Sequence, residues 1–150
     1  MAWPEGTLSR AIESYQGNPM SEKEPNSSDP IELLLVDDEK GFVDVLFKRM
    51  AKRNIRVTKA LNGLEAIQAL RQKEFHAALV DLKMEDMDGI EVLKIFKKMD
   101  PRMPVIMLTG HGSEQAAREG LAQGAFDYLT KPCDMDDLVE KIREAVRKGG

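Results

Sequence analysis

Runs of consecutive apolar residues alternate with helical repeats of apolar residues from residue 31 to residue 148. A short unbroken apolar run is typical of a strand buried on both faces of a sheet, and apolar residues spaced three and four apart indicate a covering helix. The runs predict strands at residues 31–36, 76–80, 105–108 and 126–129, and the β-branched residues of 55–58 predict another. A helix is predicted after each strand, and the apolar positions of the first are Phe42, Val45, Leu46 and Met50.

This alternation predicts an α/β fold in which helices cover both faces of one parallel sheet, a doubly wound (βα)5 three-layer sandwich. The domain is expected to span residues 30–148, with residues 149–150 as a C-terminal tail. Residues 1–29 are polar and rich in Ser, Glu, Asn and Pro, so we expect a flexible N-terminal leader. The alternative is a docking helix with Leu8, Ile12 and Tyr15 on one face.

Composition narrows the classes of function. Hydrophobic residues make up 42% and charged residues 32% of the 150 positions, which is typical of a soluble globular protein. A net charge of −4 gives no electrostatic basis for direct nucleic-acid binding by this domain. The single cysteine, Cys133, excludes an internal disulfide framework, and no apolar run approaches the roughly 20 residues of a membrane helix. We therefore expect a cytoplasmic protein without a membrane segment.

Polar residues stand at the carboxyl ends of four predicted strands. Asp37 and Asp38 follow the first strand, Asp81 follows the third, Thr109 the fourth and Lys131 the fifth. In parallel sheets of this class the ligand site lies outside the carboxyl ends of the strands. The pattern and the fold rule therefore predict the same place for a functional site.

These residue types together suit a divalent cation and a phosphoryl group. Three clustered carboxylates repel one another, and Mg²⁺, which prefers oxygen ligands and is often shared with a phosphate, would relieve the conflict. Asp81 stands alone at its strand end and is the expected nucleophile, forming an acyl phosphate. Lys131 would neutralise phosphoryl oxygens as a point charge, and the Thr109 hydroxyl would donate to another of them. Taken singly, the acids, Thr109 and Lys131 also fit helix caps, turns and solvated loops; their joint placement at strand ends favours a site.

The motifs in combination resemble those of the response-regulator receiver domain of two-component signalling. They are residues 35–39 (Leu-Val-Asp-Asp-Glu), Asp81 followed by residues 87–89 (Met-Asp-Gly), residues 108–110 (Leu-Thr-Gly) and residues 124–132, which end in Lys-Pro. The resemblance covers residues 31–148. It implies a flavodoxin-like sheet with strand order 2-1-3-4-5.

The resemblance also implies a role for each site residue. Asp81 would be the phosphoacceptor, with Mg²⁺ bound directly by Asp38 and Asp81, through water by Asp37, and by the backbone carbonyl of Lys83. Lys131 would bind the phosphoryl group, and a cis peptide bond would precede the proline that follows it. Thr109 and Tyr128 would form the switch pair, in which the threonine hydroxyl moves toward the phosphoryl group, the tyrosine rotates into the vacated space, and the surface of the fourth helix, fifth strand and fifth helix changes.

Four positions modify this picture. Glu85 follows Met84 where the family often has proline, which would loosen the loop after Asp81 and add a negative charge. Cys133 replaces a common phenylalanine and is expected to fill a smaller apolar gap, with a redox role as the alternative. Lys83 and His111 lie two residues after Asp81 and Thr109, and we expect them to tune the lifetime of the phosphorylated state.

The expected partners are a sensor histidine kinase or phosphotransfer protein, and either a downstream protein or an output domain of a longer regulator; a homodimer is a further option. Two other functions stay open. A phosphorylation-independent interaction module often lacks one of the key residues, but all are present here. A phosphatase of the haloacid-dehalogenase type needs a second aspartate two residues after the nucleophile, where this chain has Lys83 after Asp81, or Glu39 after Asp37.

Overall fold

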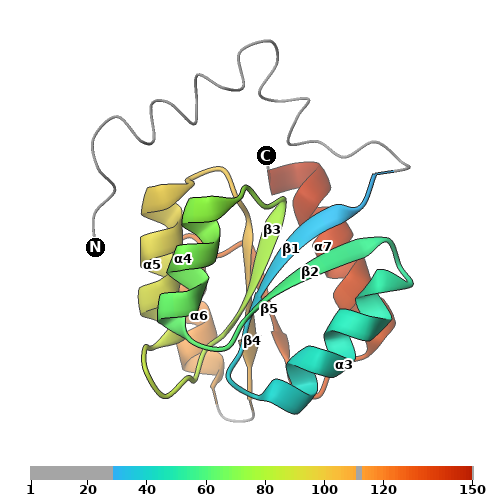
Figure 1. The fold of residues 1–150 in the computed structure, drawn as a ribbon. Helices are drawn as coiled ribbons and strands as arrows, with labels where there is room; N and C mark the ends of the chain where they lie inside the picture. Colours follow the sequence, from blue (N-terminus) through green and yellow to red (C-terminus); the bar gives the residue numbers. More distant parts are fainter. Residues whose placement is uncertain (1–28, 111–112, 150) are drawn as a thin grey trace.

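The computed structural model describes residues 29–110 and 113–149, in which strands and helices strictly alternate (Figure 1). The strands are β1 (Ile31–Val36), β2 (Ile55–Ala60), β3 (Ala77–Asp81), β4 (Val105–Thr109) and β5 (Asp127–Thr130). The helices are α3 (Lys40–Ala51), α4 (Gly63–Gln72), α5 (Gly89–Met99), α6 (Glu114–Ala122) and α7 (Met135–Gly149). The expected leader falls almost entirely on residues 1–28, which lie outside the described residues.

All five strands pair in parallel in the order β2-β1-β3-β4-β5, which confirms the predicted fold class and strand order. The register sets which residues meet at the carboxyl edge. Val36 pairs with Val80 across β1 and β3, so the residues that follow them, Asp37 and Asp81, come out side by side. Asp81 pairs in turn with Leu108 of β4, which places Thr109 at the same edge.

Helices cover both faces of the sheet, with α3 and α7 on one face and α4, α5 and α6 on the other (Figure 1). Successive residues of a strand point to opposite faces, so Leu33 and Leu35 pack toward α3 and α7 while Leu34 and Val36 pack toward α4 and α5. All four side chains are fully buried. Each such burial contributes roughly 1.5–3 kcal/mol, which holds the strand ends in a fixed relative position.

Element boundaries differ from the sequence prediction by one or two residues. Strand β2 continues to Ala60, and β4 includes Thr109, because backbone hydrogen bonding with the neighbouring strand does not require an apolar side chain. Strand β3 begins after His76 and includes Asp81. Helix α7 continues to Gly149, one residue beyond the expected end of the domain.

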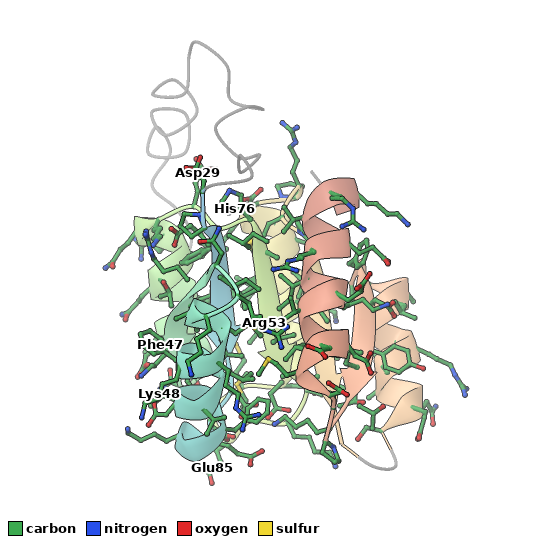
Figure 2. All side chains as sticks on the ribbon, turned by 90° about the vertical axis from the view of Figure 1, so that its right-hand side faces the viewer. Asp29, Phe47, Lys48, Arg53, His76 and Glu85 are labelled. Atoms are coloured by element: carbon green, nitrogen blue, oxygen red, sulfur yellow. The ribbon has the colours of Figure 1, made fainter. Side chains whose placement is uncertain are left out.

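The buried face of α3 also differs from the simplest reading of its apolar spacing. Val43, Leu46 and Met50 are buried, whereas Val45 is 47% exposed and Phe47 is 40% exposed. Phe47 lies at the left flank of α3 in Figure 2. The Lys59 ammonium lies 4.3 Å from the centre of its ring, so part of this exposed aromatic surface is covered by a cation.

Side-chain caps fix the starts of three helices. The Asn62 side chain accepts a hydrogen bond from the Glu65 N–H and is therefore the N-cap of α4. Asp88 accepts from the Ile90 N–H at the start of α5, and Asp134 accepts from the Asp136 N–H at the start of α7. Within the described residues no helix is long and apolar enough to cross a membrane.

Candidate functional site

Three carboxylates meet at the carboxyl edge of the sheet. Asp37 and Asp38 follow β1 and Asp81 ends β3, and one oxygen from each lies within 4.8 Å of the others. Asp37 is fully buried, Asp81 is 7% exposed, and Asp38 is open to solvent. The predicted convergence of the acids is therefore present, with one open side through which a small ligand can reach them.

The surroundings of Asp81 disfavour the ionised form of its carboxyl group. Burial, together with the neighbouring Asp37 carboxylate, raises the pKa of Asp81 to about 6, although Lys131 and a hydrogen bond from the Lys83 backbone act against the shift. A cation bound beside Asp81 would neutralise the surrounding negative charge and would stabilise the ionised form of its carboxylate. The donor set consists of oxygen atoms only, which is the set that Mg²⁺ prefers.

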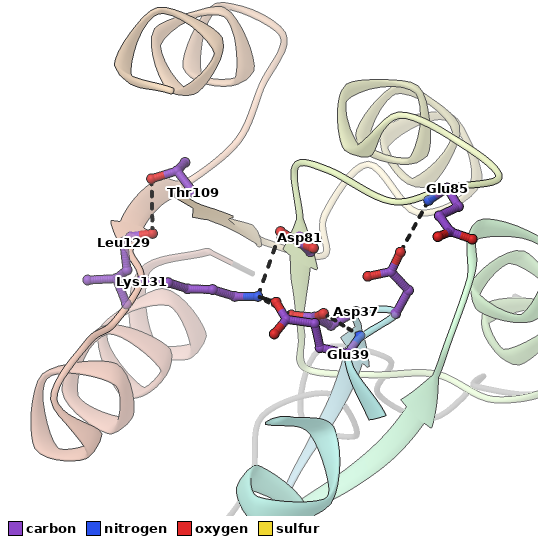
Figure 3. A network of polar contacts seen from close by, with 8 residues as sticks. Asp37, Glu39, Asp81, Glu85, Thr109, Leu129 and Lys131 are labelled. Carbon is purple, nitrogen blue, oxygen red and sulfur yellow. Dashed lines mark hydrogen bonds and ion pairs between the residues drawn. The ribbon is translucent and has the colours of Figure 1, made fainter. Parts of the chain in front are cut away.

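Lys131 reaches into the cluster from the loop after β5 (Figure 3). Its Nζ lies 2.6 Å from Asp37, 2.9 Å from Glu39 and 3.9 Å from Asp81. The ammonium also lies 4.4 Å from the centre of the Phe42 ring. Burial alone would lower the pKa of Lys131, but the hydrogen bonds to Asp37 and Glu39 outweigh it and raise the pKa. Lys131 is thus a fixed positive charge whose tightest partners are Asp37 and Glu39.

Backbone N–H groups orient two of the acids. The Asp37 Oδ1 accepts a hydrogen bond of 2.9 Å from the Glu39 N–H, which leaves its Oδ2 for Lys131. The Asp38 Oδ2 accepts one of 3.2 Å from the N–H of Glu85, which lies in the loop that follows β3 (Figure 3). Sequence reasoning missed both donors, because a backbone N–H carries no signal in the residue type.

Thr109 is 2% exposed and its hydroxyl points toward β5 (Figure 3). Its Oγ1 lies 3.4 Å from the Leu129 carbonyl oxygen and 3.3 Å from the Thr130 Oγ1. Tyr128, the other member of the expected switch pair, is half-buried against the core on the α4–α6 side of the sheet. The structure therefore places both residues on adjacent strands, with the threonine hydroxyl bonded away from Asp81.

The loop after Asp81 folds back closely on the backbone of β3. A Cβ on Gly89 would lie 2.3 Å from the Asp81 carbonyl oxygen and 2.7 Å from the Leu82 Cα, so this position requires glycine. The Gly89 N–H donates to the Leu82 carbonyl at 3.0 Å, and the Leu82 N–H donates to Leu108 of β4 at 2.9 Å. These two hydrogen bonds hold Leu82, the residue that follows Asp81, through both its N–H and its carbonyl.

The remaining predicted positions are placed as follows. Lys83 is exposed beside Asp81, and His111 lies outside the described residues. The peptide bond between Lys131 and Pro132 is cis, as the resemblance implied. Cys133 packs against the core on the α3–α7 side, and burial raises the pKa of its thiol, in agreement with the expected apolar filling.

Comparison with known sequences gives a match over most of the domain. Residues 33–143 match the model of the response regulator receiver domain. The chain is 39% identical over 120 residues to the transcriptional regulatory protein ZraR of Klebsiella oxytoca, and 38% identical over 122 residues to the transcriptional regulatory protein GlrR of Escherichia coli (strain K12). These matches cover 80% and 81% of this chain but 27% and 28% of the relatives, so the chain spans about a quarter of their length.

Solved structures agree. A CheY-like response regulator receiver domain protein from Methanospirillum hungatei JF-1 superposes with a TM-score of 0.77 at 31% identity, covering 81% of this chain and 97% of that one. The receiver domain of the Francisella response regulator 1452 gives a TM-score of 0.74 at 30% identity, covering 80% and 99%. With the strand order and the acidic edge of the sheet in agreement as well, this chain belongs to the family of response regulator receiver domains.

Proposed function

We propose that Asp81 accepts a phosphoryl group from the phosphohistidine of a sensor histidine kinase or phosphotransfer protein, with Mg²⁺ held by Asp37, Asp38, Asp81 and the Lys83 carbonyl. The observation that carries this proposal is that Asp81 lies close to the Lys131 ammonium. Asp81 is a nearly buried carboxylate with its pKa raised to about 6, and Lys131 lies 3.9 Å from it. On this reading the domain is a signalling switch rather than an enzyme that turns over an external substrate.

The chemistry assigns a task to each side chain. An oxygen of the ionised Asp81 attacks phosphorus, the P–N bond to the donor imidazole breaks, and the bonding electrons leave with the imidazole nitrogen. Bound Mg²⁺ would supply positive charge to the transferring oxygens. Lys131 exchanges part of its contact with Asp37 and Glu39 for a phosphoryl oxygen. Hydrolysis of the acyl phosphate by water returns Asp81 to its carboxylate.

The proposed switch begins at Thr109. Its hydroxyl leaves Leu129 and donates to a phosphoryl oxygen, which opens space for Tyr128 on the adjacent strand. A half-buried tyrosine that changes position alters the surface of α6, β5 and α7. That surface would contact a downstream protein, an output domain or a second copy of the chain. Lys83 and His111 would set the lifetime of the acyl phosphate.

The proposal also covers the cellular location of the domain and its relation to nucleic acid. Two-component receivers meet their kinases in the cytoplasm, and we place this domain there. Direct nucleic-acid binding is assigned to other parts of such regulators, since this chain carries a net charge of −4.

Intact-mass analysis after incubation with Mg²⁺ and acetyl phosphate tests the proposal. The parent should gain one phosphoryl group, and the gain should vanish with a chelator and in Asp81→Ala. Asp137→Ala, which removes an exposed carboxylate from the first turn of α7, serves as the matched control and should behave as the parent. Absence of any adduct, combined with absence of a complex with beryllofluoride and Mg²⁺, would instead identify a phosphorylation-independent interaction module.

A further inference from the structure

The loop between Asp81 and α5 is tied to the rest of the domain at two consecutive residues, Glu85 and Asp86. It carries Lys83, whose carbonyl belongs to the proposed metal site. Glu85 lies at the end of the domain opposite Asp29 and His76 (Figure 2), and its N–H donates to Asp38 at 3.2 Å (Figure 3). A proline, which the family often has here, has no N–H to donate. The loop therefore depends on contacts that a proline-containing loop does not make.

Asp86 binds the start of helix α4. Its Oδ1 and Oδ2 accept hydrogen bonds of 3.1 and 3.0 Å from the Gly63 N–H, and Oδ2 lies 3.4 Å from the Leu64 N. The N-cap Asn62 satisfies the next donor, the Glu65 N–H. The first N–H groups of a helix lack partners within the helix and carry partial positive charge, so a carboxylate from outside is a favourable partner.

Apolar packing supports the same attachment. Met87 lies so close to Gly63 that a Cβ on the glycine would come within 2.9 Å of the methionine Cβ and Sδ. The contact needs glycine at the first position of α4, which is also the position whose N–H donates to Asp86. The side chains of residues 86 and 87 thus hold the loop on α4, while the backbone of residue 85 holds it on Asp38.

We infer that Asp86 is a positioning residue for the metal and phosphoryl site: by fastening the loop to helix α4, it sets the place of the Lys83 carbonyl and of the Glu85 N–H that orients Asp38. The inference rests on the proposed function for its consequence, which is that Mg²⁺ binding and the start of α4 are energetically coupled. Asp86 itself binds neither the cation nor the phosphoryl group.

Calorimetric titration of Mg²⁺ into the parent and three variants tests the inference. Asp86→Ala should weaken Mg²⁺ binding about tenfold, the lower end of what loss of a residue that supports metal ligands costs. Asp86→Asn removes the same charge but keeps a carbonyl oxygen for the Gly63 N–H, so it should recover most of the affinity. Glu91→Ala is the charge control, because Glu91 is exposed near the start of α5 and its side chain makes no hydrogen bond or ion pair within residues 29–110 and 113–149.

The pattern across the variants separates the explanations. Equal weakening in Asp86→Ala and Asp86→Asn would show that only the charge of Asp86 matters and would overturn the inference. Unchanged Mg²⁺ affinity in Asp86→Ala, with a lower melting temperature in chelator, would show a purely structural cap on α4 and would overturn it as well.

Hydrogen exchange supplies a test that needs no phosphorylation. Coupling is reciprocal, so Mg²⁺ must slow exchange of the Gly63 and Leu64 amides in the parent if Asp86 affects Mg²⁺ affinity. In the metal-free Asp86→Ala protein, the Glu85 amide should exchange faster than in the parent, because its hydrogen bond to Asp38 loses support. A parent that binds Mg²⁺ but takes no phosphoryl group would refute the proposed function and leave the inference standing. Unchanged exchange at Glu85 would refute the inference whatever the metal does.

Discussion

Asp81→Asn should make the metal-free domain more stable at neutral pH. The substitution keeps the shape of the side chain and removes a charge that the site disfavours. Asp81 is nearly buried beside Asp37, and its pKa is raised from 3.8 to about 6. A raised carboxyl pKa means that the folded state binds the proton more tightly than the unfolded state does. The stability associated with this group is therefore present below pH 4 and is lost as the pH rises through about 6.

The size of the effect follows from the shift in pKa. Each unit corresponds to about 1.4 kcal/mol, so the ionised Asp81 costs the folded state roughly 3 kcal/mol at pH 7.5. Contact with residual solvent reduces this figure only in part, since 10% of the side chain is exposed. With an m value of about 2 kcal/mol/M in urea, the substitution should raise the unfolding midpoint by roughly 1–1.5 M.

Urea unfolding in the presence of a chelator, followed by circular dichroism from pH 4 to pH 8, measures this difference. Asp81→Asn should exceed the parent at pH 7.5, and the gap should close toward pH 4. Glu140→Gln, an exposed site on α7, controls for loss of a carboxylate and should show no such gap. A gain in the free energy of unfolding that is the same at every pH, or no gain at all, would show that the surroundings of Asp81 do not disfavour its ionised form. The electrostatic account of the site would then be wrong.

Three further predictions concern the same edge of the sheet. Lys131→Ala leaves the fully buried Asp37 without its cation, so urea unfolding at pH 7.5 should show a loss of about 3 kcal/mol that added Mg²⁺ partly restores. Gly89→Ala places a Cβ 2.3 Å from the Asp81 carbonyl oxygen, and the same assay should show a loss of about 1–3 kcal/mol, together with a reduced yield of acetyl-phosphate labelling. Mg²⁺ affinity measured by calorimetry should fall about tenfold per pH unit below pH 6, because the proton competes for Asp81.

The sequence by itself determined the fold class and the placement of most of the candidate site residues. Short continuous apolar runs that alternate with helical segments are typical of parallel strands. Such strands are apolar on both faces, and helices packed on both sides of the sheet bury them. Because parallel strands end at one edge, the positions of Asp37, Asp38, Asp81, Thr109 and Lys131 just at or after strand ends were enough to bring them together. The limits of each strand were less well determined, as β2 shows by continuing two residues past its predicted end to Ala60.

Only the tertiary structure decided which partner each polar group takes. Lys131 pairs most closely with Asp37 and Glu39, which precede it by more than ninety positions, rather than with Asp81. Thr109 bonds toward Leu129. Glu85 stands where the family often has proline, and a looser loop stays a prediction for this position. Its N–H, which a proline would lack, donates to Asp38, and the next residue, Asp86, binds α4. Such pairings depend on the exact distances between groups that tertiary packing brings together, and residue type and spacing along a strand or helix do not specify those distances.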